Sequence, residues 1–194
     1  MSGPRRGLIQ ARHLPNLLTG LRLLLAPLLP WLLVSGRAGA ALAVAALAGL
    51  SDALDGWLAK RFGWGSRLGS LLDPIADKLM LGLAMLGLWL VAALPGWLLL
   101  LVALRDLVIV AGAVAWWRLA GPYDGRPTWL GKLTTFAQVL LVLACLLGLV
   151  GWLPWAPYAG QAVLVVAMLT FASGLDYVIR YGVMAWRHSR KPAA

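Results

Sequence analysis

The chain has 194 residues, of which 61% are hydrophobic, and a formal net charge of +10. Apolar runs recur along its whole length, which excludes an ordinary soluble domain and indicates an integral membrane protein with a single domain over residues 1–194. Most of the 17 Lys and Arg lie in short segments between the apolar runs, as expected for loops facing anionic lipid, so the charge does not indicate nucleic-acid binding.

The first predicted elements are a basic surface segment and an apolar stretch. The segment "MSGPRRGLIQ" is expected to lie along the membrane surface. Its two arginines, the apolar stretch and the "AGA" that follows would also suit a cleaved signal peptide. The stretch is too long for that and contains Arg22, Pro27 and Pro30, so a membrane span is favoured.

Six apolar stretches are each near the ~20 residues that a helix needs to cross a bilayer. They run over Leu14–Val34, Gly39–Leu58, Leu68–Leu90, Gly96–Ala115, Leu133–Leu153 and Ala162–Val183. No sheet pattern occurs at membrane depth. The predicted fold is therefore all-α, a polytopic membrane bundle of about six transmembrane helices with an N-terminal surface segment.

Positive charges occur in alternate links between these spans. One set of links and tails carries Arg5, Arg6, Arg12, Lys60, Arg61, Arg67, Arg118, Arg126, Lys132, Arg187, Arg190 and Lys191. The other links carry only Arg37. This asymmetry predicts a multi-pass protein of the cell (inner) membrane with both termini in the cytoplasm.

The few carboxylates are concentrated in one stretch. All 7 acidic residues are Asp, and four of them are Asp52, Asp55, Asp73 and Asp77. Helical spacings of three and four keep each pair on one face of its span. The two spans are expected to be antiparallel neighbours joined by a short turn, so all four carboxylates should converge at one level, open to the cytoplasm.

These carboxylates need compensating positive charge. An ionised Asp at the centre of a membrane helix costs ~2.5–3.5 kcal/mol, so four unpaired ones would cost on the order of 10 kcal/mol. The cations close in sequence, Lys60, Arg67 and Lys78, are fewer than the carboxylates. Divalent cations are the better explanation. Oxygen-only ligation indicates Mg²⁺, Mn²⁺ or Ca²⁺, and four carboxylates suit a two-metal site for phosphoryl chemistry.

Two glycines flank the carboxylates on the predicted helices. Gly56 follows Asp52 by one turn, and Gly69 precedes Asp73 by one turn. Each removes a side chain, which would let a bulky ligand approach the backbone. The alternative is that these small residues only allow close packing of helices.

The stretch "DALDGWLAKRFGWGSRLGSLLDPIAD" resembles the motif of the CDP-alcohol phosphatidyltransferases, D-x2-D-G-x2-A-R-x8-G-x3-D-x3-D. Every spacing is kept, and Lys60 stands where the family usually has Arg. Four further segments, "LPNLLTGLRLLLAP", "DPIADK", "WLGKLTTFAQ" and "SGLDYVIRYG", are similar to the branch with phosphatidylglycerophosphate and cardiolipin synthases. The resemblance thus covers nearly the whole chain.

The resemblance implies six spans, a homodimer and an active site in a cavity facing the cytoplasm. It implies attack of an acceptor hydroxyl on the phosphorus that carries the diacylglycerol of CDP-diacylglycerol, with release of CMP, and two Mg²⁺ or Mn²⁺ ions. The implied metal ligands are Asp52, Asp55, Asp73 and Asp77, with Asp77 also the candidate base. The residues implied at the nucleotide are Gly56, Ala59, Lys60 and Gly69.

Two basic residues outside the motif are candidates for binding an acceptor phosphate. Arg105 falls inside the fourth span, where a cation is a functional candidate, although it could instead pair locally with Asp106 or with another span. Lys132 begins the fifth span and could instead be an interfacial anchor. Asp176 and Arg180, four residues apart near the end of the sixth span, are predicted to form an intrahelical pair.

The acceptor is predicted to be of the glycerol type, and two acceptors remain open. "WLGK" is similar to glycerophosphate enzymes and favours glycerol 3-phosphate. Arg105 followed by Asp106 is more similar to cardiolipin synthases, which use phosphatidylglycerol. An alternative of another class is a cation or proton transporter that uses the Asp cluster as a relay. Such folds usually contain inverted repeats, which are not evident here.

Overall fold

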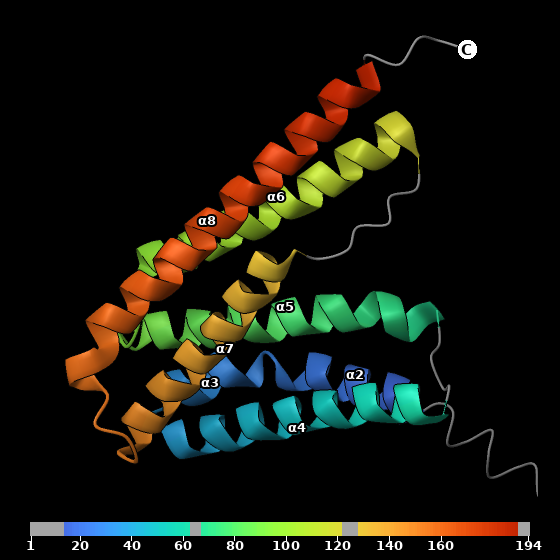
Figure 1. The fold of residues 1–194 in the computed structure, drawn as a ribbon. Coiled ribbons are helices and arrows are strands. Elements are labelled where there is room, and N and C mark those ends of the chain that lie inside the picture. Colours follow the sequence, from blue (N-terminus) through green and yellow to red (C-terminus); the bar gives the residue numbers. More distant parts are fainter. Residues whose placement is uncertain (1–13, 63–66, 122–127, 190–194) are drawn as a thin grey trace, which may run out of the picture. The chain divides into compact units, whose positions relative to one another are not determined.

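The computed structural model describes residues 14–62, 67–121 and 128–189, and all regular elements in these ranges are α-helices (Figure 1). The predicted N-terminal surface segment lies outside the described residues. The helices are α2 (Leu14–Leu25), α3 (Leu28–Val34), α4 (Ala38–Phe62), α5 (Arg67–Leu90), α6 (Gly96–Ala120), α7 (Trp129–Val150) and α8 (Ala156–Ser189). The prediction of an all-α polytopic membrane protein is confirmed.

Each of the six predicted spans corresponds to a helix or a broken helix. Among the described residues, four segments are long and apolar enough to cross a membrane: Leu17–Val34, Gly96–Arg118, Trp129–Val150 and Ala156–Met184. The apolar part of α4 is shorter, Ala38–Leu54, because Asp55, Lys60 and Arg61 occur in the rest of that helix. A count of six membrane crossings therefore remains a prediction for α4 and α5.

The first predicted span is two helices because of its prolines. Pro27 precedes the first residue of α3 with helical backbone angles, and Pro30 lies inside α3. A proline has no N–H to donate and its ring crowds the carbonyl four residues earlier, so two prolines three positions apart interrupt a helix. The span predicted over Leu14–Val34 therefore consists of two consecutive helices, and Leu17–Val34 remains one candidate membrane span.

Contacts divide the chain into two compact units. One contains α2 to α5 and the end of α7 from Val142; the other contains α6, α8 and α7 as far as Leu141. Whether these units form a single domain is not tested by this division, so the single-domain assignment stays a prediction. Each unit is described by itself below.

In the first unit, α2 and α3 each contact both α4 and α5 and lie between them (Figure 1). The sequence predicted α4 and α5 as direct neighbours; in the described residues, α2 and α3 separate them. The contact between α3 and α5 is close at Gly87, where a Cβ would come within 2.8 Å of the Pro30 backbone and of Leu33. A glycine is required there because nothing larger fits against backbone.

In the second unit, α6 packs along α8, and Arg105, Thr170 and Ser173 are buried on these helices. Gly112 of α6 faces the ring of Tyr181 on α8 so closely that a Cβ would overlap the ring. Large apolar side chains such as Leu107, Met168 and Phe171 are exposed, at 63 to 65%. Apolar groups outside and polar groups inside are typical of a helix pair surrounded by lipid.

Candidate functional site

Three of the four predicted site carboxylates are gathered around one guanidinium. Asp52 comes from α4, and Asp73 and Asp77 come from successive turns of α5. Arg22 of α2 donates through Nη1 to Asp52 Oδ1 at 2.6 Å and to Asp77 Oδ1, and through Nη2 to Asp73 Oδ1 at 3.5 Å. The convergence predicted for Asp52, Asp73 and Asp77 is therefore present.

Helix α2 supplies a second contact one turn before Arg22. The hydroxyl of Thr19 donates to Asp73 Oδ1 at 2.6 Å. Thr19 and Arg22 are 1% and 2% exposed, so both side chains are enclosed between α2 and its neighbours. Spacing of three residues on a helix places them on one face, toward the carboxylates.

Arg22 and Thr19 are absent from the site predicted from the sequence. The cations predicted near the carboxylates are close to them in sequence, whereas Arg22 is 30 residues from Asp52 and 55 from Asp77. The available signal was a Thr and an Arg one turn apart in an otherwise apolar span, since a cation at membrane depth must face protein or water.

The carboxylates remain partly accessible despite this contact. The side chains of Asp52, Asp73 and Asp77 are 49%, 42% and 52% exposed, whereas that of Arg22 is 2% exposed. The cluster thus presents carboxylate oxygens outward with a guanidinium beneath them. Oxygen donors of this kind suit Mg²⁺ or Mn²⁺, so the residues fit such ions, although no three metal-ligating side chains among the described residues already surround a common point.

The other motif residues are placed only by their backbone. Asp55, Gly56, Ala59 and Lys60 belong to α4, and Gly69 belongs to α5; their side-chain surroundings lie outside the described part of the chain. Asp55 follows Asp52 by three residues on a continuous helix, so the spacing assumed in the prediction is retained. The roles of these five residues stay predictions.

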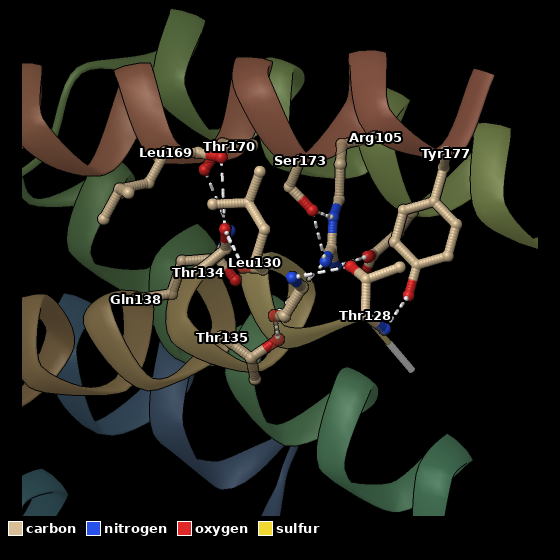
Figure 2. A network of polar contacts seen from close by, with 12 residues as sticks. Arg105, Thr128, Leu130, Thr134, Thr135, Gln138, Leu169, Thr170, Ser173 and Tyr177 are labelled. Carbon is tan, nitrogen blue, oxygen red and sulfur yellow. Dashed lines mark hydrogen bonds and ion pairs between the residues drawn. The ribbon is translucent and has the colours of Figure 1, made fainter. Parts of the chain in front are cut away.

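A second polar group surrounds Arg105 in the other unit (Figure 2). Arg105 is 8% exposed on α6. Its Nη1 donates to Asp106 Oδ1 at 2.8 Å, and its Nε and Nη2 donate to Ser173 Oγ of α8 at 3.3 and 3.0 Å. Nη2 also donates to the Gly131 carbonyl at 3.4 Å, and the guanidinium carbon lies 5.8 Å from the centre of the Tyr177 ring.

The start of α7 is built to approach this arginine. The Thr128 hydroxyl accepts from Gly131 N at 3.0 Å, which caps the first turn, and Thr128 N donates to Tyr177 Oη at 3.3 Å. A Cβ on Gly131 would lie 3.1 to 3.2 Å from Tyr177 Oη, Arg105 Nη2 and Thr128 Oγ1, so a glycine lets α7 come this close. This cap also explains why α7 begins at Trp129, four residues before the predicted Leu133.

Local pairing, one of the two interpretations left open for Arg105, is present in this geometry, and binding of an acceptor phosphate stays a prediction. The pair with Asp106 exists, and α7 and α8 contribute further contacts that hold the guanidinium in place (Figure 2). Lys132, the next residue after Gly131, is exposed in the first turn of α7. The predicted Asp176–Arg180 pair is confirmed at 2.8 Å.

The polar contacts continue along α7 and α8 away from Arg105 (Figure 2). The Thr134 hydroxyl donates to the carbonyls of Leu130 and Leu169, and Gln138 Nε2 donates to Thr170 Oγ1 at 3.1 Å. Thr134, Gln138 and Thr170 are at most 2% exposed. Such buried pairs satisfy polar groups between helices and hold α7 against α8.

Comparison with known proteins identifies the family of the chain. The family model for CDP-alcohol phosphatidyltransferase matches residues 12–176, which include the carboxylate cluster and Arg105. The chain belongs to the CDP-alcohol phosphatidyltransferase family. It is therefore a transferase in a membrane, as the motif predicted, and its family uses a CDP-alcohol and an acceptor alcohol as substrates and generally depends on divalent metal.

Named relatives fall into two groups. A probable phosphatidylglycerophosphate synthase of Mycobacterium tuberculosis is 36% identical over 92% of this chain and 86% of its own length. A chloroplastic CDP-diacylglycerol–glycerol-3-phosphate 3-phosphatidyltransferase of Oryza sativa is 33% identical over 87% of this chain and 57% of its own length. A human cardiolipin synthase (CMP-forming) is 35% identical over 69% of this chain and 50% of its own length.

Proposed function

We propose that this enzyme transfers the phosphatidyl group of CDP-diacylglycerol to glycerol 3-phosphate, which produces phosphatidylglycerophosphate and CMP. The observation that carries the proposal is the convergence of Asp52, Asp73 and Asp77 from two helices inside the family motif. Three half-exposed carboxylates at membrane depth serve poorly as packing groups, and they are suited to binding cations that hold phosphate groups.

The reaction balances as a substitution at phosphorus. The acceptor hydroxyl oxygen forms a bond to the phosphorus that bears the diacylglycerol, the bond from that phosphorus to the CMP oxygen breaks, and CMP leaves with the electron pair. The hydroxyl proton passes to a carboxylate, for which Asp77 is the proposed base, because an alcohol is a weak nucleophile until it loses its proton. When bound, divalent ions stabilise the diphosphate and the charge on departing CMP.

Four aspartates are the proposed metal ligands, and four other motif residues are proposed at the nucleotide. The ligands would be Asp52, Asp55, Asp73 and Asp77, with two Mg²⁺ or Mn²⁺ ions. The nucleotide would lie against Gly56, Ala59 and Gly69, with Lys60 near its diphosphate. Lys60 would act as a point charge where the usual Arg would form two parallel hydrogen bonds.

Arg105 and Lys132 are the proposed partners of the acceptor phosphate. Support for Arg105 comes from its surroundings, since Ser173 and the Gly131 carbonyl fix the guanidinium and one carboxylate, that of Asp106, balances its charge. A guanidinium fixed in this way is preorganised to bind an anion. Lys132 is one residue from Gly131 and would add a second positive charge.

The choice of glycerol 3-phosphate rests on the relatives and on "WLGK". The Mycobacterium phosphatidylglycerophosphate synthase matches 92% of this chain, whereas the human cardiolipin synthase matches 69%. The second candidate, a cardiolipin synthase that uses phosphatidylglycerol, is favoured by Arg105 with its neighbour Asp106 and by the several cardiolipin synthases among the relatives. Family membership leaves no observation that favours the transporter alternative.

The experiment that tests this proposal supplies each acceptor separately. Purified protein with Mg²⁺ or Mn²⁺ receives labelled CDP-diacylglycerol and either glycerol 3-phosphate or phosphatidylglycerol, and the labelled lipid is identified. Phosphatidylglycerophosphate together with CMP is expected from the first mixture. Cardiolipin from the second mixture and no product from the first would replace the acceptor and leave phosphatidyl transfer standing.

We further propose that the enzyme is a homodimer of the cell (inner) membrane, with both termini and the carboxylate cluster on the cytoplasmic side. The support is the distribution of Lys and Arg and the resemblance of the motif to its family. A water-soluble acceptor such as glycerol 3-phosphate would reach the site directly from that side.

A further inference from the structure

The buried arginine beneath the carboxylates has a charge that ordinary metal ligation does not require. Arg22 is 2% exposed and contacts Asp52, Asp73 and Asp77, so it occupies the side of the cluster that faces α2. A positive charge a few ångströms from a divalent-cation site repels the ion, and because Arg22 itself is buried, water screens this repulsion incompletely. On electrostatic grounds alone, such a residue lowers the affinity of the cluster for metal.

We propose that Arg22 is a built-in counter-cation of the carboxylate cluster that weakens metal binding to the free enzyme and makes it depend on the anionic diphosphate of the substrate. This inference rests on the proposed function of the cluster as a metal site. Arg22 is a positioning residue, because it acts through the carboxylates.

Two opposing effects of Arg22 on metal affinity must be weighed. The guanidinium holds three carboxylates from two helices together, which favours metal binding by preorganisation. It also competes for Asp52 Oδ1, Asp73 Oδ1 and Asp77 Oδ1 and repels a divalent ion. Repulsion between a unit charge and a divalent ion at contact distance exceeds the conformational entropy of ordering three short side chains. The net effect is therefore to weaken metal binding.

Charge balance explains what such weakening achieves. Four carboxylates and two divalent ions cancel, so Arg22 leaves the loaded cluster with one net positive charge. A diphosphate then binds to a cationic site and stabilises the metals in return, because coupling between two ligands is reciprocal. Without the substrate, Arg22 itself neutralises part of the carboxylate charge, which lowers the cost of holding the cluster at membrane depth.

The test measures Mn²⁺ binding to the full-length, metal-stripped protein in detergent, with and without cytidine 5′-diphosphate. Arg22→Gln should bind Mn²⁺ about tenfold or more tightly than the unchanged protein in the absence of nucleotide. The tightening that the nucleotide causes should shrink by a similar factor. Arg22→Lys, which keeps the charge, should stay within about threefold of the unchanged protein.

A matched control and a second measurement keep the test decisive. Arg180→Gln removes the same group from the exposed pair with Asp176 and should leave Mn²⁺ affinity unchanged. Because Arg22→Gln removes charge compensation, the rise in melting temperature on adding Mn²⁺ should be larger in this variant. The melting temperature can also be measured if Arg22→Gln is stable only with metal. Such a variant can be purified in Mn²⁺, and its melting temperature can be followed as the metal is removed.

The outcomes separate this inference from the proposed function. Equal or weaker Mn²⁺ binding by Arg22→Gln would overturn the inference and make Arg22 an organiser of the carboxylates only. Unchanged coupling to the nucleotide in Arg22→Gln would overturn it as well. A different result would disprove the proposed metal site itself. It is that the unchanged protein binds no Mn²⁺, or that Asp55→Asn binds Mn²⁺ as well as the unchanged protein does.

Discussion

At the scale of single residues, the two buried arginines differ in how their charge is balanced. Arg22 is surrounded by three carboxylates, so its surroundings are strongly negative. Arg105 contacts one carboxylate, one hydroxyl and one carbonyl oxygen. An arginine in excess negative charge neutralises its site, whereas an arginine balanced by one carboxylate and neutral dipoles can still attract an anion.

The carboxylates are expected to be essential for turnover and dispensable for folding. Asp55→Asn and Asp73→Asn should each abolish measurable CMP release, because each removes an ionised oxygen ligand while keeping the volume of the side chain. Size-exclusion profiles should be unchanged. Asp176→Asn, which alters a carboxylate paired with Arg180 on α8, is the matched control and should retain activity. Full activity of the unchanged enzyme in excess EDTA would contradict the metal-dependent mechanism.

The acceptor role of Arg105 can be tested by comparing the two substrates. Arg105→Ala should raise KM for the acceptor by about tenfold or more, since a charge-assisted hydrogen bond of ~1.5–3 kcal/mol is lost, and should change KM for CDP-diacylglycerol much less. Thr170→Ala is the control. Thr170 lies one turn before Ser173 on α8, and its replacement removes a buried hydrogen bond with Gln138 of α7. Both KM values should stay near normal in this variant. Equal increases in both KM values would indicate a structural role for Arg105.

Much of the carboxylate cluster was predictable from spacing, and its cation was not. Asp52, Asp73 and Asp77 lie on regular helices, so a fixed rise and rotation per residue places them on common faces. Arg22 meets them through packing of α2 against both helices, with 30 to 55 residues of intervening chain. Local periodicity contains no information on which distant helix fills the space between two others.

At the scale of elements, helix identity followed from composition, whereas helix ends depended on specific backbone contacts. Membrane-spanning length predicted the helices because apolar runs need paired backbone groups in lipid. The ends differ because caps determine them. Gly151, with a φ of 80°, ends α7 at Val150, where the prediction extended to Leu153. Helix α8 runs from Ala156 to Ser189, beyond the predicted Ala162–Val183, since a helix need not end where its apolar run ends.

The close approach of α3 to α5 gives a prediction at this scale. Gly87→Ala should destabilise the protein by ~1–3 kcal/mol, because the new methyl group would lie 2.8 Å from the Pro30 backbone, which cannot rotate away. Thermal unfolding in detergent measures this as a lower Tm. Gly82→Ala, on the same helix with no atom within 4 Å of the added group, is the control and should be neutral or stabilising by up to ~1 kcal/mol. Equal Tm values for the two variants would disprove the close contact.

At the scale of the whole molecule, the exposed and buried surfaces are arranged for lipid. Among the described residues, large apolar side chains are exposed on every helix, and the fully buried side chains include Arg22, Gln138, Thr134, Thr170 and Ser173. Water would favour the opposite arrangement. Arg22 and Arg105 are thus each buried within their own unit, whereas the carboxylates around Arg22 stay half-exposed, and access to them depends on which side of the membrane each helix end faces.

The predicted orientation of the protein in the membrane can be measured by labelling single introduced cysteines, because the chain has only one cysteine to remove. Its single cysteine, Cys145, is 1% exposed in α7, so Cys145→Ala yields a protein in which one introduced thiol reports its own position. Arg37→Cys, in the exposed link between α3 and α4, should react with a membrane-impermeant maleimide in intact cells, because the links that lack Lys and Arg clusters face away from the cytoplasm. Arg118→Cys, exposed near the end of α6, should react only after the membrane is opened. The reverse pattern of labelling would indicate the opposite topology. The carboxylates would then lie on the side away from cytoplasmic glycerol 3-phosphate. In that case, a lipid acceptor already in the membrane would become the better candidate.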